Sequence, residues 1–270
     1  MRSALLNVLI FLVIGYGLLL TGLYAFQRKL MYHPDQDRPV PARYRLFEAQ
    51  SLAIPGHDTL PLFSWYQKPS ASENRIILYF HGNAGTIAGR SNKAQEFVSK
   101  GFGVLLPSYR YNAGNGGEPS ETSLIADGLS AYQWLLEQGY APDQIILYGE
   151  SLGSGIAVAI AAQREAAAVI LEAPYSSVAD VAQGTYWFLP ARWLVHDPFP
   201  STDRIGRITA PILIVHGAKD RTIPLKYAER LYQAAPEGAQ FQILPDAGHA
   251  DLYDHGMADA VFAFLSGSNP

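Results

Sequence analysis

Residues 145–157 read Ile145-Ile146-Leu147-Tyr148-Gly149-Glu150-Ser151-Leu152-Gly153-Ser154-Gly155-Ile156-Ala157, and they are the most informative segment for the type of fold. The run from Ile145 to Tyr148 predicts a strand buried on both faces, and the residues from Ser154 to Ala162 predict a helix. The pattern Gly-x-Ser-x-Gly stands between them, where a sharp strand-to-helix turn requires small neighbours. The sequence therefore predicts that Ser151 is a nucleophile placed beside the positive end of a helix.

Further short apolar runs lie on both sides of this stretch, separated by segments of helical periodicity such as Ile125 to Leu136, which Gly139 ends. Buried strands that alternate with helices indicate a mostly parallel sheet with helices on each face, a three-layer α/β sandwich. Residues 45–53 and 60–67 predict two added antiparallel strands before it. The other apolar runs are Ile76–Phe80, Val104–Leu106, Val169–Leu171, Ile212–Val215 and Phe241–Leu244.

Composition excludes several classes of function. The chain has 270 residues, of which 49% are hydrophobic and 16% charged, and it has no cysteine. Disulfides, thiolate catalysis and zinc–thiolate or iron–sulfur sites are therefore excluded. The net charge of −4 and the absence of a long basic run give no indication of nucleic-acid binding.

The apolar excess is concentrated near the N-terminus. Leu5–Phe26 is a run of 22 residues without a charge, and a helix of this length is about 33 Å long, enough to cross a ~30 Å hydrocarbon core. A cleaved signal peptide is the alternative, but its apolar region is usually shorter and is followed by small residues. We expect a single-pass membrane anchor and linker over residues 1–41 and a globular domain over 42–270. The basic residues after the helix outnumber those before it, which predicts a cytoplasmic globular domain.

A serine nucleophile needs a base and an orienting acid. His249 lies in a loop between the last strand and the last helix, and Asp220 follows the strand before it. The order Ser151, Asp220, His249 is typical of a Ser-His-Asp triad on this type of sheet. Glu172, at the end of the preceding strand, is the alternative acid. The other histidines lie before the core, in His-Gly pairs at strand ends, in an insertion, or inside the last helix: His33, His57, His81, His216, His196 and His255.

An acyl-transfer site also needs two N–H donors for the oxyanion. The residue after the nucleophile, Leu152, supplies one of them. The second is expected from the loop Phe80–Gly85, where Gly82 permits a turn and the Asn83 N–H points inward, with Ala84 as the nearest alternative. Since both donors are backbone groups, Asn83→Ala is expected to be mild.

An insertion between Pro174 and Asp203, here called the cap, is rich in aromatic residues. It follows a core strand at the active edge of the sheet. The aromatic side chains fit either an apolar lid that binds an acyl chain or faces the bilayer, or a helical pair that packs on the sheet.

These motifs together resemble the α/β-hydrolase-fold serine hydrolases of the membrane-anchored Bem46-like branch, and also the α/β-hydrolase-domain protein depalmitoylases. The resemblance rests on the segments Gln27–Pro34, Phe80–Gly85, Gly149–Gly153, Ala218–Pro224 and Asp246–His249. It implies hydrolysis of carboxylic esters or thioesters, with lysophospholipase-like or deacylase roles. One stretch departs from the family pattern of Asp-Tyr-Arg-Gly: the segment Ser108–Gly117 lacks the acidic residue and adds glycines, which predicts a more mobile loop.

We therefore expect a membrane-anchored serine hydrolase that acts on lipid-like or acylated substrates and needs no metal or cofactor. A serine peptidase of the same fold is an alternative, because the same triad serves it. A non-catalytic, membrane-tethered scaffold is the alternative outside the enzymes.

Overall fold

The computed structural model describes residues 2–267 and has one eight-stranded sheet at its centre. The strand order is β1-β2-β4-β3-β5-β6-β7-β8; β2 is antiparallel to β1 and β4, and every other pair is parallel. The strands are β1 (Gln50–Pro55), β2 (Pro61–Gln67), β3 (Ile76–Phe80), β4 (Gly103–Pro107), β5 (Ile145–Glu150), β6 (Ala168–Glu172), β7 (Ile212–Gly217) and β8 (Gln240–Leu244). The predicted mostly parallel sheet with antiparallel N-terminal strands is confirmed.

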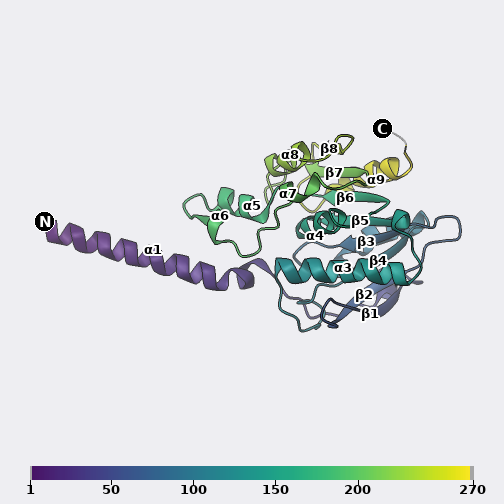
Figure 1. Ribbon diagram of the computed structural model, residues 1–270, viewed down its shortest axis with the longest axis horizontal. Coiled ribbons are helices and arrows are strands. Elements are labelled where there is room, and N and C mark those ends of the chain that lie inside the picture. The colour runs from purple at the N-terminus through teal and green to yellow at the C-terminus, as the bar shows by residue number, and fades with distance from the viewer. Residues whose placement is uncertain (1, 268–270) are drawn as a thin grey trace.

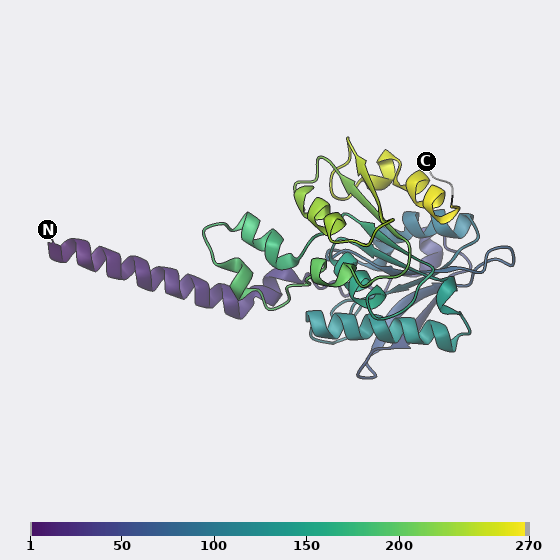
Figure 2. The ribbon, with the colours of Figure 1, turned by 45° about the horizontal axis from the view of Figure 1, so that its top comes forward.

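Helices cover both faces of this sheet (Figures 1 and 2). Side chains of α3, α4, α7 and α8 pack into the apolar core on one face, and those of α2 and α9 pack into the core on the other. The central strands β3, β4, β6 and β7 are buried along their whole length because both faces are covered. The helices are α1 (Arg2–Met31), α2 (Ser91–Ser99), α3 (Glu121–Glu137), α4 (Leu152–Ala161), α5 (Val178–Thr185), α6 (Ala191–Leu194), α7 (Thr202–Ile205), α8 (Lys226–Gln233) and α9 (Met257–Leu265). Short 3₁₀ helices are η1 (Pro41–Tyr44), η2 (Ile87–Arg90), η3 (Pro142–Gln144) and η4 (Leu252–His255).

Two boundaries differ from those that the sequence predicts. Strand β1 begins at Gln50 rather than at residue 45, because η1 precedes it and Arg45 adopts a left-handed φ of 58° that no strand continues. Helix α1 extends beyond the predicted residues 5–26 to Met31, since the charges of Arg28 and Lys29 do not end a helix. Pro34 excludes a helical conformation at the residue before it, which limits α1 on that side.

Helix α1 projects from the sandwich, with its last turns beside the cap helices α5 and α6 (Figures 1 and 2). Within the described residues it is the one helix that is long and apolar enough to cross a membrane, judged by length and composition, with a mean hydropathy of 2.3 and none of that window buried.

The parallel strands bring their carboxyl ends to one edge of the sheet. Phe80 at the end of β3 pairs with Gly149 of β5, and Glu150 pairs with Glu172 of β6. Strands β7 and β8 end beside them, and the loops that follow all five strands therefore meet at this edge. Ligands of open α/β sheets bind at this edge.

Candidate active site

The turn between β5 and α4 holds Ser151 in a strained backbone conformation. Its φ of 50° and ψ of −117° lie in a region that residues with a Cβ rarely adopt. The neighbouring glycines make the turn possible: a Cβ on Gly149 would lie 2.5 Å from the Cα of Ser154, and a Cβ on Gly153 would overlap the carbonyl oxygen of Phe80. The Gly-x-Ser-x-Gly pattern is thus required for α4 to pack closely against the ends of β3 and β5.

The three residues that the sequence predicts for the triad are in contact. His249 Nε2 lies 3.0 Å from Ser151 Oγ, and His249 Nδ1 lies 2.7 Å from Asp220 Oδ2. A carboxylate only accepts hydrogen bonds, so Nδ1 carries the proton and Nε2 is free to accept from the serine hydroxyl. The three residues come from the loops after β5, β7 and β8. The arrangement fits a nucleophile, a base and an orienting acid.

Asp220 is held in its ionised form. Its other oxygen, Oδ1, accepts hydrogen bonds from the N–H groups of Thr222 and Ile223, each at 2.8 Å. Burial opposes the charge of this carboxylate, but hydrogen bonds from His216 and His249 outweigh burial and hold the pKa of Asp220 well below its ordinary value. The carboxylate therefore stays fixed and charged beside the imidazole.

The alternative acid, Glu172, is engaged elsewhere. Its carboxylate accepts hydrogen bonds from Lys93 Nζ and from the hydroxyl of Tyr148, both at 2.7 Å. Its backbone carbonyl accepts from the Ser151 N–H at 2.9 Å and so supports the turn. Asp220, not Glu172, is the carboxylate in contact with His249.

Four charged side chains form a largely buried ion cluster beneath the turn: Arg90, Lys93, Glu150 and Glu172. Arg90 Nη2 lies 2.7 Å from Glu150 Oε1, and Lys93 Nζ bridges the two carboxylates at 3.1 and 2.7 Å. Burial alone would raise the pKa of both acids, but the charges of Lys93 and Arg90 prevail at Glu150 and hold its pKa well below the ordinary value. At Glu172 burial prevails and raises the pKa. No sequence pattern indicates this cluster, because its basic and acidic members lie at least 57 positions apart in the chain.

The ion cluster also supports the loop after β3, which is the predicted source of an oxyanion donor. A Cβ on Gly82 would lie 2.8 Å from Glu150 Oε1, 2.9 Å from Arg90 Nη2 and 3.5 Å from the Cβ of Ser151, so the loop passes directly over the ion pair and beside the serine. Arg90 Nη1 donates to the carbonyls of Ala84 and Thr86. The other predicted donor, Leu152, is the first residue of α4, where N–H groups have no partner within the helix.

The side chain of Asn83 has a role that the sequence did not reveal. Its Nδ2 donates to the carbonyl of Met31, the last residue of α1, and its Oδ1 accepts from the hydroxyl of Tyr111 at 3.2 Å. The prediction that Asn83→Ala is mild rested on the backbone alone. These contacts instead indicate that the side chain fixes the position of the loop.

Two other histidines are placed as follows. His81 is fully buried, with Nδ1 2.7 Å from the carbonyl of Gly82 and its ring 4.1 Å from that of Tyr109. Burial, with the charge of Arg90, lowers its pKa to about 3, and the ring is therefore neutral. His255 ends η4 and lies just before α9, not inside the last helix as the sequence predicted.

The segment Ser108–Gly117 is packed in place rather than free. Arg110 Nη2 lies within 2.8–3.1 Å of Asp127, Asp58 and His57, three side chains that are close enough together to hold a metal ion. The guanidinium group already supplies the cation there. The N–H of Ala113 donates to the carbonyl of Asp35 at 2.7 Å, and both contacts argue against the mobile loop that the extra glycines predicted.

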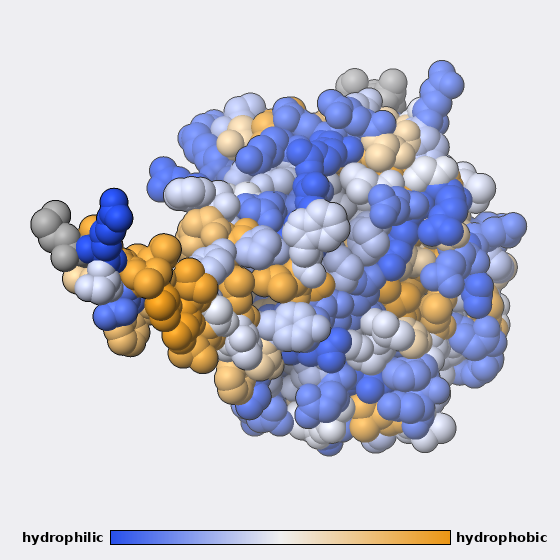
Figure 3. All heavy atoms as spheres, turned by 60° about the vertical axis from the view of Figure 1, so that its left-hand side comes forward, coloured by the Kyte–Doolittle hydropathy of each residue, from blue (hydrophilic) through white to orange (hydrophobic). Residues whose placement is uncertain are grey.

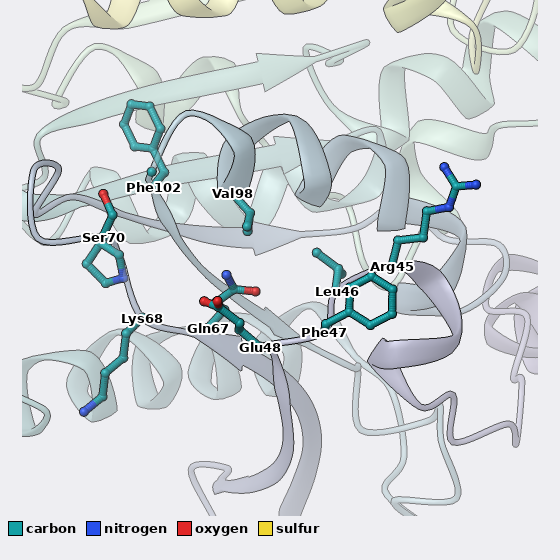
Figure 4. A pocket seen from close by; sticks show the side chains of 11 residues that line it. Arg45, Leu46, Phe47, Glu48, Gln67, Lys68, Ser70, Val98 and Phe102 are labelled. Atoms are coloured by element: carbon teal, nitrogen blue, oxygen red, sulfur yellow. The ribbon is translucent and has the colours of Figure 1, made fainter.

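Two surface hollows lie away from Ser151. One, of about 350 Å³, is lined by residues around Leu46, Gln67 and Phe102 at the β2 side of α2 (Figure 4). The other, of about 440 Å³, lies between the β1–β2 turn and α3. Neither contains a residue of the triad.

Comparisons with known proteins agree with this fold. The sequence model of the family described as alpha/beta hydrolase fold matches residues 75–195 and 184–256. An uncharacterized protein of Mycobacterium tuberculosis is 36% identical over 253 residues, which cover 92% of this chain and 90% of that protein. The lysophosphatidylserine lipase ABHD12 of Danio rerio is 31% identical over 206 residues, covering 67% of this chain and 54% of the lipase.

A solved structure shares the fold. The esterase Pf2001 of Pyrococcus furiosus superposes with a TM-score of 0.69 at 17% identity, covering 87% of this chain and 97% of the esterase. At this identity the likeness concerns the fold alone. Because the family model matches most of the chain, and the Mycobacterium relative is 36% identical over 92% of it, the chain belongs to the alpha/beta hydrolase fold family.

Proposed function

We propose that this protein is a membrane-anchored serine hydrolase that cleaves carboxylic esters or thioesters of lipid-like or acylated molecules. The observation that carries the proposal is the continuous chain of contacts from Ser151 Oγ through His249 to Asp220, at 3.0 and 2.7 Å. The family, which includes esterases and lipases, supports hydrolysis as the reaction class. The proposed reaction uses no metal and no cofactor.

The reaction proceeds in two acyl-transfer steps. Ser151 Oγ attacks the acyl carbonyl while His249 Nε2 takes the hydroxyl proton, and the N–H groups of Leu152 and Asn83 stabilise the oxyanion. His249 then gives the proton to the leaving alcohol or thiol, and the acyl group stays on Ser151. Water attacks this ester with His249 again as the base, which releases the acid and restores the serine.

The substrate class follows from where the site is held. Residues 1–41, which include α1, would form a membrane anchor and linker. They would keep the hydrolase domain, residues 42–270, at the surface of the bilayer, where lipid-like molecules are concentrated. A relative named as a lysophosphatidylserine lipase supports a lipid ester. We propose that the chain belongs to the membrane-anchored Bem46-like branch, and we expect hydrolysis of single-chain lipid esters or of acylated proteins.

The globular domain is proposed to face the cytoplasm, since the basic residues after the apolar run Leu5–Phe26, beginning with Arg28 and Lys29, outnumber those before it. A reporter fused after Pro270 that is active only in the cytoplasm supports this orientation. Activity only on the opposite side of the membrane contradicts it.

Labelling by a fluorophosphonate probe tests the nucleophile. We expect the full chain to be labelled and Ser151→Ala to be unlabelled, while the exposed Ser99→Ala, in α2, is labelled like the parent chain. A parent chain that is folded but unlabelled would favour the non-catalytic scaffold. A panel of acyl esters, thioesters and aminopeptide substrates, each compared with Ser151→Ala, then separates an esterase from a thioesterase and from a peptidase.

A further inference from the structure

Helix α1 is bound along one side to the cap. Tyr16 Oη donates to the carbonyl of Phe188 at 3.0 Å, and Gln27 Nε2 donates to the carbonyl of Leu194 at 2.9 Å. Arg28 forms a two-pronged ion pair with Asp197, at 2.8 and 2.9 Å. The stretch from Tyr16 to Arg28 therefore runs beside the cap, as Figure 2 shows for the two segments.

These contacts fix how far the cap extends along the helix. Tyr16 precedes Arg28 by twelve residues, which is about 18 Å along a helix axis. If the hydrocarbon region begins at the first charged residue of the helix end, Arg28, then the carbonyl of Phe188 lies inside it. Even after allowing for the reach of the tyrosine side chain, this carbonyl lies roughly a third of the way across a ~30 Å core.

The tip of the cap has the surface that such a position requires. Trp187 and Trp193 are 80% and 85% exposed, and Tyr186 and Phe188 are about half exposed, which is unusual for large apolar side chains in contact with water. The apolar surface of α1 continues onto the neighbouring part of the body (Figure 3). Arg192 is the one charged side chain between residues 182 and 195, and its guanidinium group turns back to Asp180.

Several backbone carbonyls of the tip are bonded within the protein. The carbonyl of Tyr186 accepts from the Leu189 N–H at 2.9 Å, the carbonyl of Leu189 accepts from Gln183 Nε2 at 2.9 Å, and the carbonyl of Phe188 accepts from Tyr16. Irregular backbone is tolerated at membrane depth only where its polar groups are bonded within the protein.

We propose that the tip of the cap, residues 186–194, is inserted into the bilayer leaflet beside the end of α1. The proposal rests on the membrane anchoring proposed above and adds a second point of entry into the bilayer. The surrounding medium is lipid, because the helix that would span the bilayer runs beside the tip over about three turns, from Tyr16 to Gln27.

The insertion determines where the active site lies. The start of the cap contacts the nucleophile turn, where Tyr175 Oη donates to the carbonyl of Leu152 at 3.1 Å. The loop of Asn83 contacts the carbonyl of Met31, three residues or about 5 Å beyond Arg28. Ser151 therefore lies near the level of the lipid headgroups, where the ester carbonyls of glycerolipids are found. A single-chain or acyl lipid would reach it from within that leaflet.

Tryptophan fluorescence tests this placement, because the two cap tryptophans are more exposed than the other two: Trp65 is fully buried and Trp134 is half-buried on α3. The full chain is reconstituted in phosphatidylcholine vesicles whose acyl chains carry bromine either near the headgroup or near the chain end. The same measurement is made on Trp187→Phe and Trp193→Phe. The quenching that each variant loses relative to the parent chain gives the depth of the tryptophan that was replaced.

We expect bromine to quench both cap tryptophans and aqueous iodide to quench neither. Trp187, next to the contact with Tyr16, is expected to be the deeper of the two, and Trp193, next to the contact with Gln27, the shallower. Quenching of both by iodide but not by bromine, in protein that floats with the vesicles, overturns the insertion and leaves the anchor in place. Protein that does not float with vesicles contradicts the anchoring itself. Fluorophosphonate labelling of each variant in detergent shows that it is folded.

Discussion

The two carboxylate oxygens of Asp220 bind different groups, so one substitution can remove the charge and keep the backbone hydrogen bonds. In Asp220→Asn the amide oxygen can still accept from the N–H groups of Thr222 and Ile223, but the negative charge beside His249 is lost. We expect kcat/KM for a short water-soluble ester to fall about 10³- to 10⁴-fold, with little change in the unfolding transition. Initial rates and urea unfolding measure the two effects.

The matched control is Glu172→Gln, the other acid at this edge of the sheet. Its carboxylate bonds to Lys93 and Tyr148, so the variant is expected to lose about 1–3 kcal/mol of stability and to keep most of its activity per folded molecule. An equal loss of activity in Glu172→Gln, with Asp220→Asn unaffected, would assign the orienting acid to Glu172.

The pH dependence of hydrolysis follows from the same three residues. A protonated His249 cannot take the serine proton, so kcat/KM should fall on the acid side of the pH profile. Asp220 adds no second loss near neutral pH, because its pKa is held well below the ordinary value. A single ionisation should therefore describe the acid limb, and a profile without an acid limb contradicts the role of His249.

His81 provides a separate dependence of stability on pH. Its pKa is lowered from 6.5 to about 3 by burial, so between these values the unfolded chain binds a proton that the folded chain does not. Stability therefore rises with pH through this window and is lost as the pH falls below about 6.5, by up to about 5 kcal/mol in total. Urea unfolding of His81→Phe should show a shallower loss between pH 6.5 and 4 than the parent chain. Parallel curves would mean that His81 is protonated without cost in the folded state.

The sequence predicted the individual residues that follow strand ends. Ser151, Asp220 and His249 each follow a parallel strand of one sheet, and the carboxyl ends of those strands lie at one edge. The choice between Asp220 and Glu172 needed coordinates, because both carboxylates follow strands at that edge. The contact between Asn83 and Met31 joins residues 52 positions apart and has no sequence pattern.

At the scale of elements, the close approach of α4 to β3 depends on Gly153. A methyl group there would overlap the carbonyl oxygen of Phe80, and backbone atoms on both sides leave little room for adjustment. We expect Gly153→Ala to cost about 3 kcal/mol or more and to abolish labelling of Ser151. Gly89→Ala in η2 is the control, since a Cβ there meets no atom within 4 Å, and its stability should change by less than about 1 kcal/mol. Equal stability of the two variants would show that α4 can move away from β3.

Apolar periodicity predicted the buried strands and the longer helices well, because both faces of the sheet are covered and each element repeats its pattern. Boundaries set by backbone geometry were missed. The left-handed residue Arg45 delays β1, and the charged residues 28 and 29 remain within α1, which no count of apolar residues indicates.

At the scale of the whole molecule, Asp197 joins three parts. It pairs with Arg28 of α1, lies in the cap, and accepts a hydrogen bond from the N–H of Glu121 at the start of α3, at 2.8 Å. Asp197→Ala is expected to lower stability by about 1–3 kcal/mol and to speed proteolysis between residues 27 and 40, because a buried N–H and the guanidinium group lose their partner. Hydrolysis of an ester in vesicles should fall more than that of a water-soluble ester.

The control for this variant is Asp143→Ala, an exposed carboxylate in η3. It should resemble the parent chain in stability, proteolysis and both activities. Unchanged proteolysis and vesicle activity in Asp197→Ala would mean that the contact between α1 and the cap has no part in the reaction at the membrane.

The sequence predicted an N-terminal apolar helix and an aromatic cap, but not their contact. The residues that join the two features are more than 160 positions apart in the chain, and pairs such as Arg28 with Asp197 are single residues without periodicity. The sequence also does not distinguish cap aromatics that face lipid from cap aromatics that pack on the sheet, since both arrangements require the same apolar side chains.

The ion pair between Arg28 and Asp197 has a consequence for protein engineering and for divergence among relatives. A chimera that grafts the cap of one homologue onto the body of another leaves Arg28 facing a foreign segment, and exchanging the first helix alone does the same to Asp197. The two segments should therefore be inherited, and transplanted, as a matched set.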